Sequence, residues 1–276
     1  MYYIKEDDKP SKIANFFHFV KLENDTIILP IVDTKLNEKT AYILATKTKN
    51  ILDKTNSKKL VLSKQVKQQE AYMNYLYSYN YEIVDGRWLF QMLLFDVLKY
   101  IIKKLKIKEE EIKIGILVND ISDLAIYAIE KLVTKYKYVK IVTNHLACFK
   151  KLEKKISEEK GIFINVGNNK RKILSKVNII LNLDFPSELI NQYIINHTAI
   201  IINFKGNVKI QNKRFNGLNI NGYEIDWKTN PHLDKFEAKD IYEAMQYKKQ
   251  PIEEILKRIK RDKVIIQYLK GEKTVI

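Results

Sequence analysis

Cysteine, glycine and proline are all scarce in this sequence. Its 276 residues include 1 cysteine, 8 glycines and 5 prolines. The single cysteine, Cys148, excludes an intramolecular disulfide and any multi-cysteine metal site. The histidines at 18, 197 and 232 show no metal-ligand spacing, so we expect no metal. No apolar run approaches the ~18 residues that a membrane-spanning helix needs.

The first residues also lack the layout of a secretory signal. Charged side chains interrupt Met1–Asp8 before an apolar stretch can form. The composition, 46% hydrophobic and 30% charged, is that of a soluble globular protein. We therefore expect a cytoplasmic protein that does not engage a membrane, and the length favours two domains.

Positive charge is in excess. The chain has 49 Lys and Arg against 33 Asp and Glu, which gives a net charge of +16. Nucleic acid is the polyanion that such a charge suggests, but a nucleic-acid footprint clusters on one face. Here the lysines are scattered through every segment, which favours solvated surface lysines over an interface.

The N-terminal part, residues 1–107, reads as a small α/β domain. Phe16–Leu22 and Thr26–Val32 flank a turn and predict a β-hairpin. The other expected elements are strands at Met1–Lys5, Lys59–Ser63 and Tyr81–Val84 and helices at Asn37–Leu52, Lys64–Tyr79 and Arg87–Leu105. The last helix is apolar on most sides, so we expect it to be buried and to join the two domains.

Residues 108–226 predict a Rossmann-like domain with a parallel sheet. Near-continuous apolar runs, typical of parallel strands covered on both faces, alternate with helical segments. The expected strands are Ile112–Val118, Tyr138–Thr143, Gly161–Val166, Asn178–Leu183 and Ala199–Phe204. The expected helices are Ser122–Tyr136, Leu146–Lys160, a short one at Lys170–Ser175 and another that begins at Pro186.

The C-terminal part, residues 227–276, is expected to be helical. Lys235–Lys249 and Pro251–Leu269 read as helices, and Asn216-Gly217 and Asn221-Gly222 before them read as turns. An apolar stripe on the second helix is expected to pack across the first domain or against a second subunit, which would make a homodimer. The same helix carries the one dense basic cluster, Lys257, Arg258, Lys260, Arg261 and Lys263, which is the nucleic-acid candidate.

Polar side chains gather where the expected parallel strands end. Ligands of such sheets bind beyond the carboxyl ends of the strands. We therefore expect one cleft there to bind a small molecule or a protein partner. Its candidate ligand-binding residues are Asn119, Asp120, Asn144, His145, Asn168 and Asp184.

Several of these stretches are similar to motifs of one known family. Val139–His145 resembles the second strand of shikimate dehydrogenase-like NADP-binding domains, and Val177–Leu183 resembles the strand that borders the nicotinamide there. Asp85-Gly86 before a helix is similar to the family's Thr-Asp-Gly element. The resemblance implies NAD(P) as cofactor and a catalytic pair, for which Asp85 and Lys64 are the candidates.

The phosphate-binding loop departs from that family. Its glycine-rich turn lets the backbone approach a pyrophosphate, whereas this chain has Asn119–Asp123 there without a glycine. Ile121 would block close approach, and Asp120 and Asp123 place negative charge at the helix N-terminus. His145 stands where the family has arginine. We therefore expect standard NAD(P) binding to be weak or absent.

Three classes of function remain open on the sequence. The favoured one is a non-catalytic Rossmann-like protein with a ligand-binding, sensing or assembly role. The alternatives are a divergent NAD(P)-dependent oxidoreductase and a basic protein that associates non-specifically with nucleic acid. The sequence leaves open whether the chain catalyses any reaction.

Overall fold

The computed structural model describes residues 1–31, 35–55, 58–246, 249–272 and 274–276. The chain divides into two compact units, each of which the chain enters twice. Unit 1 comprises residues 1–86 and 228–249, and unit 2 comprises residues 87–227 and 250–276. Among the described residues, no helix is long and apolar enough to cross a bilayer.

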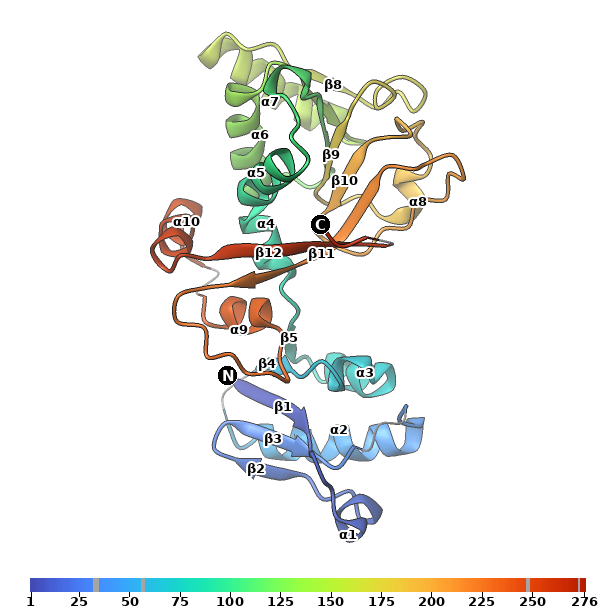
Figure 1. Cartoon of the computed structure of the whole chain (residues 1–276), viewed down its shortest axis with the longest axis vertical. Coiled ribbons are helices and arrows are strands. Elements are labelled where there is room, and N and C mark those ends of the chain that lie inside the picture. The colour runs from blue at the N-terminus through green and yellow to red at the C-terminus, as the bar shows by residue number, and fades with distance from the viewer. Residues whose placement is uncertain (32–34, 56–57, 247–248, 273) are drawn as a thin grey trace. The chain divides into compact units, whose positions relative to one another are not determined.

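Unit 1 is built on a five-stranded sheet in the order β2-β3-β1-β4-β5. All neighbours pair in parallel except β2 and β3, which form the expected hairpin around Asn24. Figure 1 shows these strands in blue to cyan. The strands are β1 (Tyr2–Glu6), β2 (Lys21–Glu23), β3 (Thr26–Leu29), β4 (Lys59–Leu62) and β5 (Glu82–Val84).

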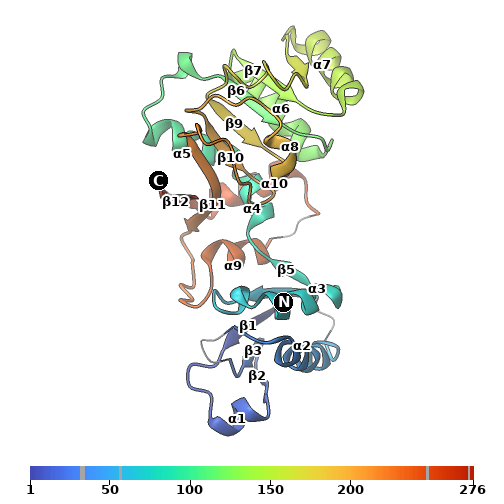
Figure 2. The ribbon, with the colours of Figure 1, turned by 90° about the vertical axis from the view of Figure 1, so that its right-hand side faces the viewer.

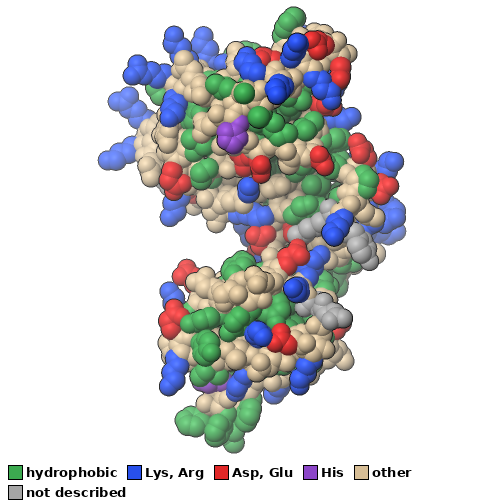
Figure 3. Space-filling view, turned by 180° about the vertical axis from the view of Figure 1, so that it is seen from behind, with side chains coloured by type: hydrophobic (Ala, Val, Ile, Leu, Met, Phe, Trp, Pro, Cys, Tyr) green, Lys and Arg blue, Asp and Glu red, His purple; other side chains and the backbone are tan. Residues whose placement is uncertain are grey.

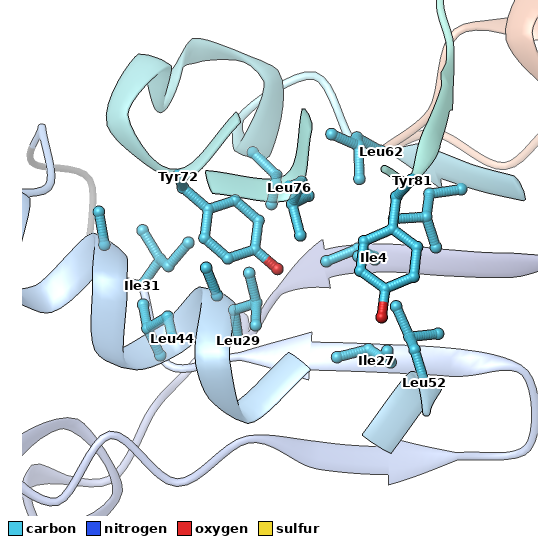
Figure 4. Packing of buried hydrophobic residues seen from close by; sticks show 14 residues of the cluster. Ile4, Ile27, Leu29, Ile31, Leu44, Leu52, Leu62, Tyr72, Leu76 and Tyr81 are labelled. Carbon is cyan, nitrogen blue, oxygen red and sulfur yellow. The ribbon is translucent and has the colours of Figure 1, made fainter. Parts of the chain in front are cut away.

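One face of this sheet carries the main core of unit 1. Helices α2 (Glu38–Leu52) and α3 (Glu70–Ser78) pack against each other and contribute side chains to that core. Asn37 caps α2, since its Oδ1 accepts the Thr40 N–H at 2.9 Å. Figure 4 shows Tyr72 and Leu76 reaching from α3 toward Leu29 and Leu44.

The buried Tyr72 keeps its hydroxyl satisfied. It lies 2.8 Å from the Thr48 Oγ1, and neither residue is exposed. Burial raises the pKa of Tyr72 well above the ordinary value, so the phenol stays protonated. Packing, rather than presentation to a ligand, therefore explains this tyrosine.

The other face of the unit 1 sheet is covered by the segment that returns from unit 2. Its helix α9 (Ala238–Ala244) contacts β4 and β5, and Phe236 packs edge-on against Tyr3. Strand side chains alternate between faces, so Leu60 and Leu62 enter the main core while Val61 points to the α9 side. The expected return of C-terminal helices across the first domain is confirmed for α9. The helix that carries the expected apolar stripe, α10 (Ile252–Arg261), belongs instead to unit 2, where it contacts α4 (Arg87–Met92).

Unit 2 is built on a seven-stranded sheet in the order β12-β11-β10-β9-β6-β7-β8. The six strands from β11 to β8 are parallel, and only β12 runs antiparallel. Renumbered along the chain, these six follow the Rossmann order 3-2-1-4-5-6. They are β6 (Ile114–Leu117), β7 (Val139–Val142), β8 (Asn165–Gly167), β9 (Ile179–Asn182), β10 (Ile200–Asn203) and β11 (Leu218–Asp226).

Helices lie on both faces of this sheet. Strand order proceeds outward from β6 in one direction and from β9 in the other, so right-handed crossovers place α6 and α8 on opposite faces. Figure 1 shows α6 and α8 on either side of the strands, and Figure 2 gives the view turned by 90°. The helices are α4 (Arg87–Met92), α5 (Leu94–Lys104), α6 (Asp123–Lys135), α7 (Leu146–Lys160), α8 (Ser187–Ile190) and α10 (Ile252–Arg261).

The fold class is thus confirmed, but several expected elements differ. The helix expected at Arg87–Leu105 is broken at Leu93 into α4 and α5, and both parts belong to unit 2. The expected domain end at residue 107 therefore differs from the division observed at Gly86. Packing decides this, because Phe90 of α4 stacks on Tyr223 of β11 with ring centroids 4.4 Å apart.

The C-terminal third holds two strands that the sequence did not predict. Asn221-Gly222, expected as a turn, lies inside β11 at an irregularity of the ladder. The helix expected at Pro251–Leu269 ends at Arg261, and the chain turns through Lys263 (φ 55°) into β12 (Ile265–Gly271). The antiparallel ladder with β11 supplies hydrogen bonds that outweigh the helical pattern.

Smaller differences concern the ends of elements. Phe16 belongs to a short helix, α1 (Lys12–Phe16), and the Lys64–Tyr79 segment divides into η1 (Val66–Gln68) and α3. Lys170–Ser175 forms turns instead of a helix. A further 3₁₀ turn, η2, covers Glu109–Glu111. Val32, the expected end of a hairpin strand, and residues 247–248 of the expected helix Lys235–Lys249 lie outside the described residues.

Candidate functional site

At the carboxyl edge of the unit 2 sheet, where strand order reverses, the Asp184 side chain joins the loops of two neighbouring strands. Asn119 and Asp120 follow β6, and Asp184 follows the neighbouring strand β9. The Asp184 carboxylate accepts the Asn119 N–H at 2.8 and 2.9 Å and the Asp120 N–H at 2.7 Å. Ligands of Rossmann sheets bind in the crevice at such a reversal of strand order, and here an internal carboxylate holds the loop backbone.

Ser122 makes two further hydrogen bonds within this loop and the first turn of α6. The Ser122 Oγ caps α6 by accepting the Ala125 N–H at 3.2 Å, and the Ser122 N–H donates to the Asp120 carbonyl. Ser122 is therefore the N-cap of α6. Ile121 is 45% exposed at the tip of this turn. The N–H groups of Asn119, Asp120, Ser122 and Ala125 therefore all have acceptors within the chain.

Burial raises the pKa of the Asp184 carboxyl. The hydrogen bonds from Asp120 and Asn119 and the charge of Lys205 offset only part of that rise, and the charge of Asp120 adds to it. A half-buried carboxylate in this position is a structural acceptor for the loop backbone.

A second set of hydrogen bonds joins the β6 loop to the β7 loop. The Asn119 Oδ1 accepts the Asn144 N–H at 2.9 Å, and the Asn119 carbonyl lies 3.0 Å from the His145 Nδ1. Thr143 takes part as well, because its Oγ1 accepts the His145 N–H at 3.0 Å. The structure thus brings five of the six candidates for ligand binding into one network.

The sixth candidate, Asn168, is exposed and follows β8, the next strand along this edge. The five others are held by bonds among themselves: Asn119, Asp120, Asn144, His145 and Asp184. Their grouping at one edge could be predicted, because the carboxyl ends of parallel strands meet there. That they form hydrogen bonds with one another could not. That they bind a ligand stays a prediction.

A ladder of buried asparagines, which the sequence reading missed, lies beside this edge. The Asn182 Nδ2 donates to the Asn203 Oδ1 at 2.8 Å, and the Asn203 Nδ2 lies 2.8 Å from the Asn219 Oδ1 and 2.9 Å from the Asn221 Oδ1. Asn203 has no exposed surface. Asparagine at the end of consecutive apolar strands, as in Ile179–Asn182 and Ile200–Asn203, was the available signal.

Lys64 and Asp85, the catalytic candidates, both belong to unit 1. Lys64 is exposed, and its Nζ donates to the Asp234 carbonyl at 3.0 Å. Asp85 is exposed too, and Gly86 after it has a positive φ of 76°. A Cβ at Gly86 would lie 2.8 Å from the Lys239 side chain, so the Asp-Gly pair has a structural reason.

Lys67, which the sequence did not single out, is a half-buried lysine of unit 1. Its Nζ pairs with Glu237 at 2.7 Å and, at shorter range, with Asp240, and the Lys239 Nζ pairs with Glu237 at 2.9 Å. We call Lys67, Glu237, Lys239 and Asp240 the Lys67 cluster. Its acidic members lie 170 or more positions from Lys67, so only the return of α9 brings them together.

The Lys67 cluster contains two lysines and two carboxyl groups, but the burial of Asp240 is only partly compensated. Burial raises the pKa of Asp240 to about 7, and its Oδ1 has no hydrogen-bond partner among the described residues. Burial alone would lower the pKa of Lys67, but Asp240 and Glu237 outweigh it and leave that pKa raised. Lys67 is therefore an ammonium at neutral pH, which is unsuited to act as a base or a nucleophile.

The basic cluster of α10 does not form one strip. Lys257 and Lys260 face a cleft against other helices of unit 2, while the Arg258 guanidinium donates to Gln250 at 2.8 Å. Arg261 pairs with Asp262, and Lys263 lies beyond the helix. In Figure 3 the Lys and Arg side chains are likewise dispersed over the visible face, with acidic side chains among them.

Among the described residues, no group of three or more His, Cys, Asp or Glu side chains is placed to hold a metal ion. No protein-family model matches the sequence. No curated protein matches it either.

Two solved structures are similar to this chain at the level of fold. L-tryptophan dehydrogenase from Nostoc punctiforme aligns at 10% identity with a TM-score of 0.34, over 68% of this chain and 53% of that one. A predicted aspartate carbamoyltransferase from Trypanosoma cruzi aligns at 14% identity with a TM-score of 0.25, over 73% and 69%. The aligned part thus spans about half of the dehydrogenase.

Similarity this distant does not indicate a shared activity. The strand order of unit 2 by itself makes the fold Rossmann-like. The narrower likeness to shikimate dehydrogenases stays a prediction.

Proposed function

We propose that this chain is a non-catalytic Rossmann-like binding protein with a sensing or assembly role, and that it does not hold NAD(P) in the standard position. One observation carries the proposal. The Asp184 carboxylate takes the N–H groups of Asn119 and Asp120 at the reversal of strand order. A pyrophosphate at that position would have to displace a carboxylate from its hydrogen bonds and then lie beside it.

The electrostatics of unit 1 support the same proposal. An oxidoreductase related to shikimate dehydrogenases would use a lysine with an aspartate on its substrate. Lys64 donates instead to a backbone carbonyl, and the charge of Lys67 is neutralised by Glu237 and Asp240. Both lysines thus have partners within unit 1.

Isothermal calorimetry with NADH and NADPH tests the proposal. Neither cofactor is expected to saturate the protein below about 1 mM, the range in which binding free energy is only ~4 kcal/mol. The Asp184→Ala variant, which frees the two N–H groups, serves as the matched comparison. Micromolar affinity of the unaltered protein for either cofactor would overturn the proposal and restore the oxidoreductase alternative.

A further inference from the structure

A cleft in unit 2, remote from the sheet edge, has the make-up of a ligand site. It lies among α5, α6 and α10, has a volume of about 720 Å³, and is lined by 15 residues. Pockets for small organic ligands occupy roughly 300–1,000 Å³. We call it the lysine cleft, after Lys99, Lys131, Lys135, Lys257 and Lys260, which all line it.

On α6 and α10 most of the residues that line the cleft differ from those buried in the core. On α6 the stripe is Tyr127, Lys131 and Thr134, whereas the core face includes Ala128, Ile129 and Leu132. On α10 the stripe is Glu253, Leu256, Lys257 and Lys260; of its two buried residues, Ile259 also lines the cleft and Ile255 does not. Spacings of three, four and seven residues put each stripe on one side of its helix.

The walls of the cleft are apolar and aromatic. Phe95 of α5 meets Tyr127 of α6 edge-on, with ring centroids 6.1 Å apart, and Leu256 of α10 lines the same cleft. Tyr136, which follows α6, contributes a third aromatic ring. Flat apolar surfaces of this kind accommodate a ring system or a short acyl chain.

The charge around these walls is positive. The five lysines face two carboxylates, Asp96 and Glu253, which leaves three positive charges. The Lys131 Nζ lies 5.5 Å from the Tyr127 ring centroid, and the Lys135 Nζ lies 5.2 Å from that of Tyr136. No ion pair is recorded for any of the five lysines within the part of the chain that the structure describes.

We infer that the lysine cleft binds a small amphiphilic organic anion, with an apolar ring or acyl body against Phe95, Tyr127 and Leu256 and a carboxylate or sulfonate among the lysines. Charge complementarity selects the anionic head, and the apolar walls select against a polar body such as a sugar. The inference deepens the proposed binding function by naming a ligand class. It uses a different surface from the NAD(P) position, so each can fail without the other.

Anilinonaphthalene sulfonate, an amphiphilic anion whose fluorescence rises in apolar surroundings, is the probe. We expect saturable binding to the native protein, displacement by decanoate, and weakening at high salt because the attraction is electrostatic. The double variants K257E/K260E and K131E/K135E reverse charges on opposite walls. Each is expected to raise the Kd of the probe by about tenfold or more, since a tenfold change needs only ~1.4 kcal/mol.

The matched control is K172E/K176E, which reverses two exposed lysines of unit 2 outside the cleft. Its Kd should stay within about twofold of the unaltered protein, and near-UV circular dichroism checks that every variant keeps native packing. Absence of saturable binding, or equal affinity in all the variants, would overturn the inference. A third result would also overturn it: the protein sediments together with phosphatidylglycerol vesicles, and decanoate fails to displace the probe. The cleft would then be a membrane-contact surface.

Discussion

The Asp184 carboxylate and the Asn119 N–H, 65 positions apart in sequence, meet at 2.8 and 2.9 Å across the two central strands of unit 2. Replacing Asp184 by alanine leaves the N–H groups of Asn119 and Asp120 without their acceptor. We expect the free energy of unfolding to fall by about 1–3 kcal/mol. Urea unfolding followed by tryptophan fluorescence measures this in unit 2, because both tryptophans, Trp88 and Trp227, belong to it.

Two further variants test the same bond. Asp184→Asn keeps one carbonyl oxygen as acceptor and should lose less stability than Asp184→Ala. Asp120→Ala removes a neighbouring exposed carboxylate and should change stability by less than about 0.5 kcal/mol. Equal losses in Asp184→Ala and Asp120→Ala would show that the hydrogen bonds of Asp184 do not hold the loop.

Lys67 is predicted to matter far more than Lys64 for the stability of unit 1. Lys67→Met removes the cation that faces Glu237 and Asp240 and leaves the fully buried Asp240 without its ion-pair partner. We expect a loss of about 2–4 kcal/mol. Urea unfolding followed by circular dichroism measures it.

Lys64→Met is the matched control, three positions away, because Lys64 is exposed and donates only to a backbone carbonyl. Its effect should stay below about 1 kcal/mol. The reverse ranking of Lys64→Met and Lys67→Met would move the important lysine back to the position suggested by family resemblance.

Asp240 is predicted to make stability fall as pH rises from about 4 to 7. Its pKa is about 7 in the folded protein against an ordinary value of 3.8, so the folded state binds the proton more tightly. Over that window each pH unit costs up to ~1.4 kcal/mol. Glu237 acts in the opposite sense, but its pKa of about 2 confines the effect to pH values below 4.5.

Unfolding free energies at several pH values between 4.5 and 7.5 measure this slope. Asp240→Asn, which does not titrate, should flatten it, although Lys67, Glu237 and Lys239 still face the position. Asp234→Asn changes an exposed residue of the same segment and should leave the slope as it is. An unchanged slope in Asp240→Asn would contradict the assignment.

Asn203 is predicted to be the most sensitive asparagine of the ladder. Its amide joins Asn182 on one side to Asn219 and Asn221 on the other. Asn203→Ala leaves these buried groups partly unsatisfied, with an expected loss of about 2–4 kcal/mol. Asn144→Ala, at an exposed position, should cost under about 0.5 kcal/mol by the same fluorescence measurement. Comparable losses of stability in Asn203→Ala and Asn144→Ala would contradict this, because water would then satisfy the amides that Asn203 leaves.

Local pattern was enough to place much of the fold. The apolar runs at Ile114–Leu117, Val139–Val142 and Ile179–Asn182 are strands because every face of a central parallel strand is buried. Asn37 and Ser122 are caps because a short polar side chain there satisfies an N–H of the first turn. These features depend on neighbours within a few residues, or on burial alone, so the sequence by itself determined them.

Partners distant in the chain decided the rest. Ile265–Gly271 is a strand because it pairs with β11 in an antiparallel ladder, although the spacing of its apolar residues continues the helical stripe. The acidic partners of Lys67 arrive on α9 from 170 or more positions away, and Asp184 becomes a loop acceptor only because β9 lies beside β6. Hydrogen bonds and ion pairs between distant residues leave no local pattern. The polar edge could therefore be predicted from sequence, but the hydrogen bonds of Asp184 to the loop backbone could not.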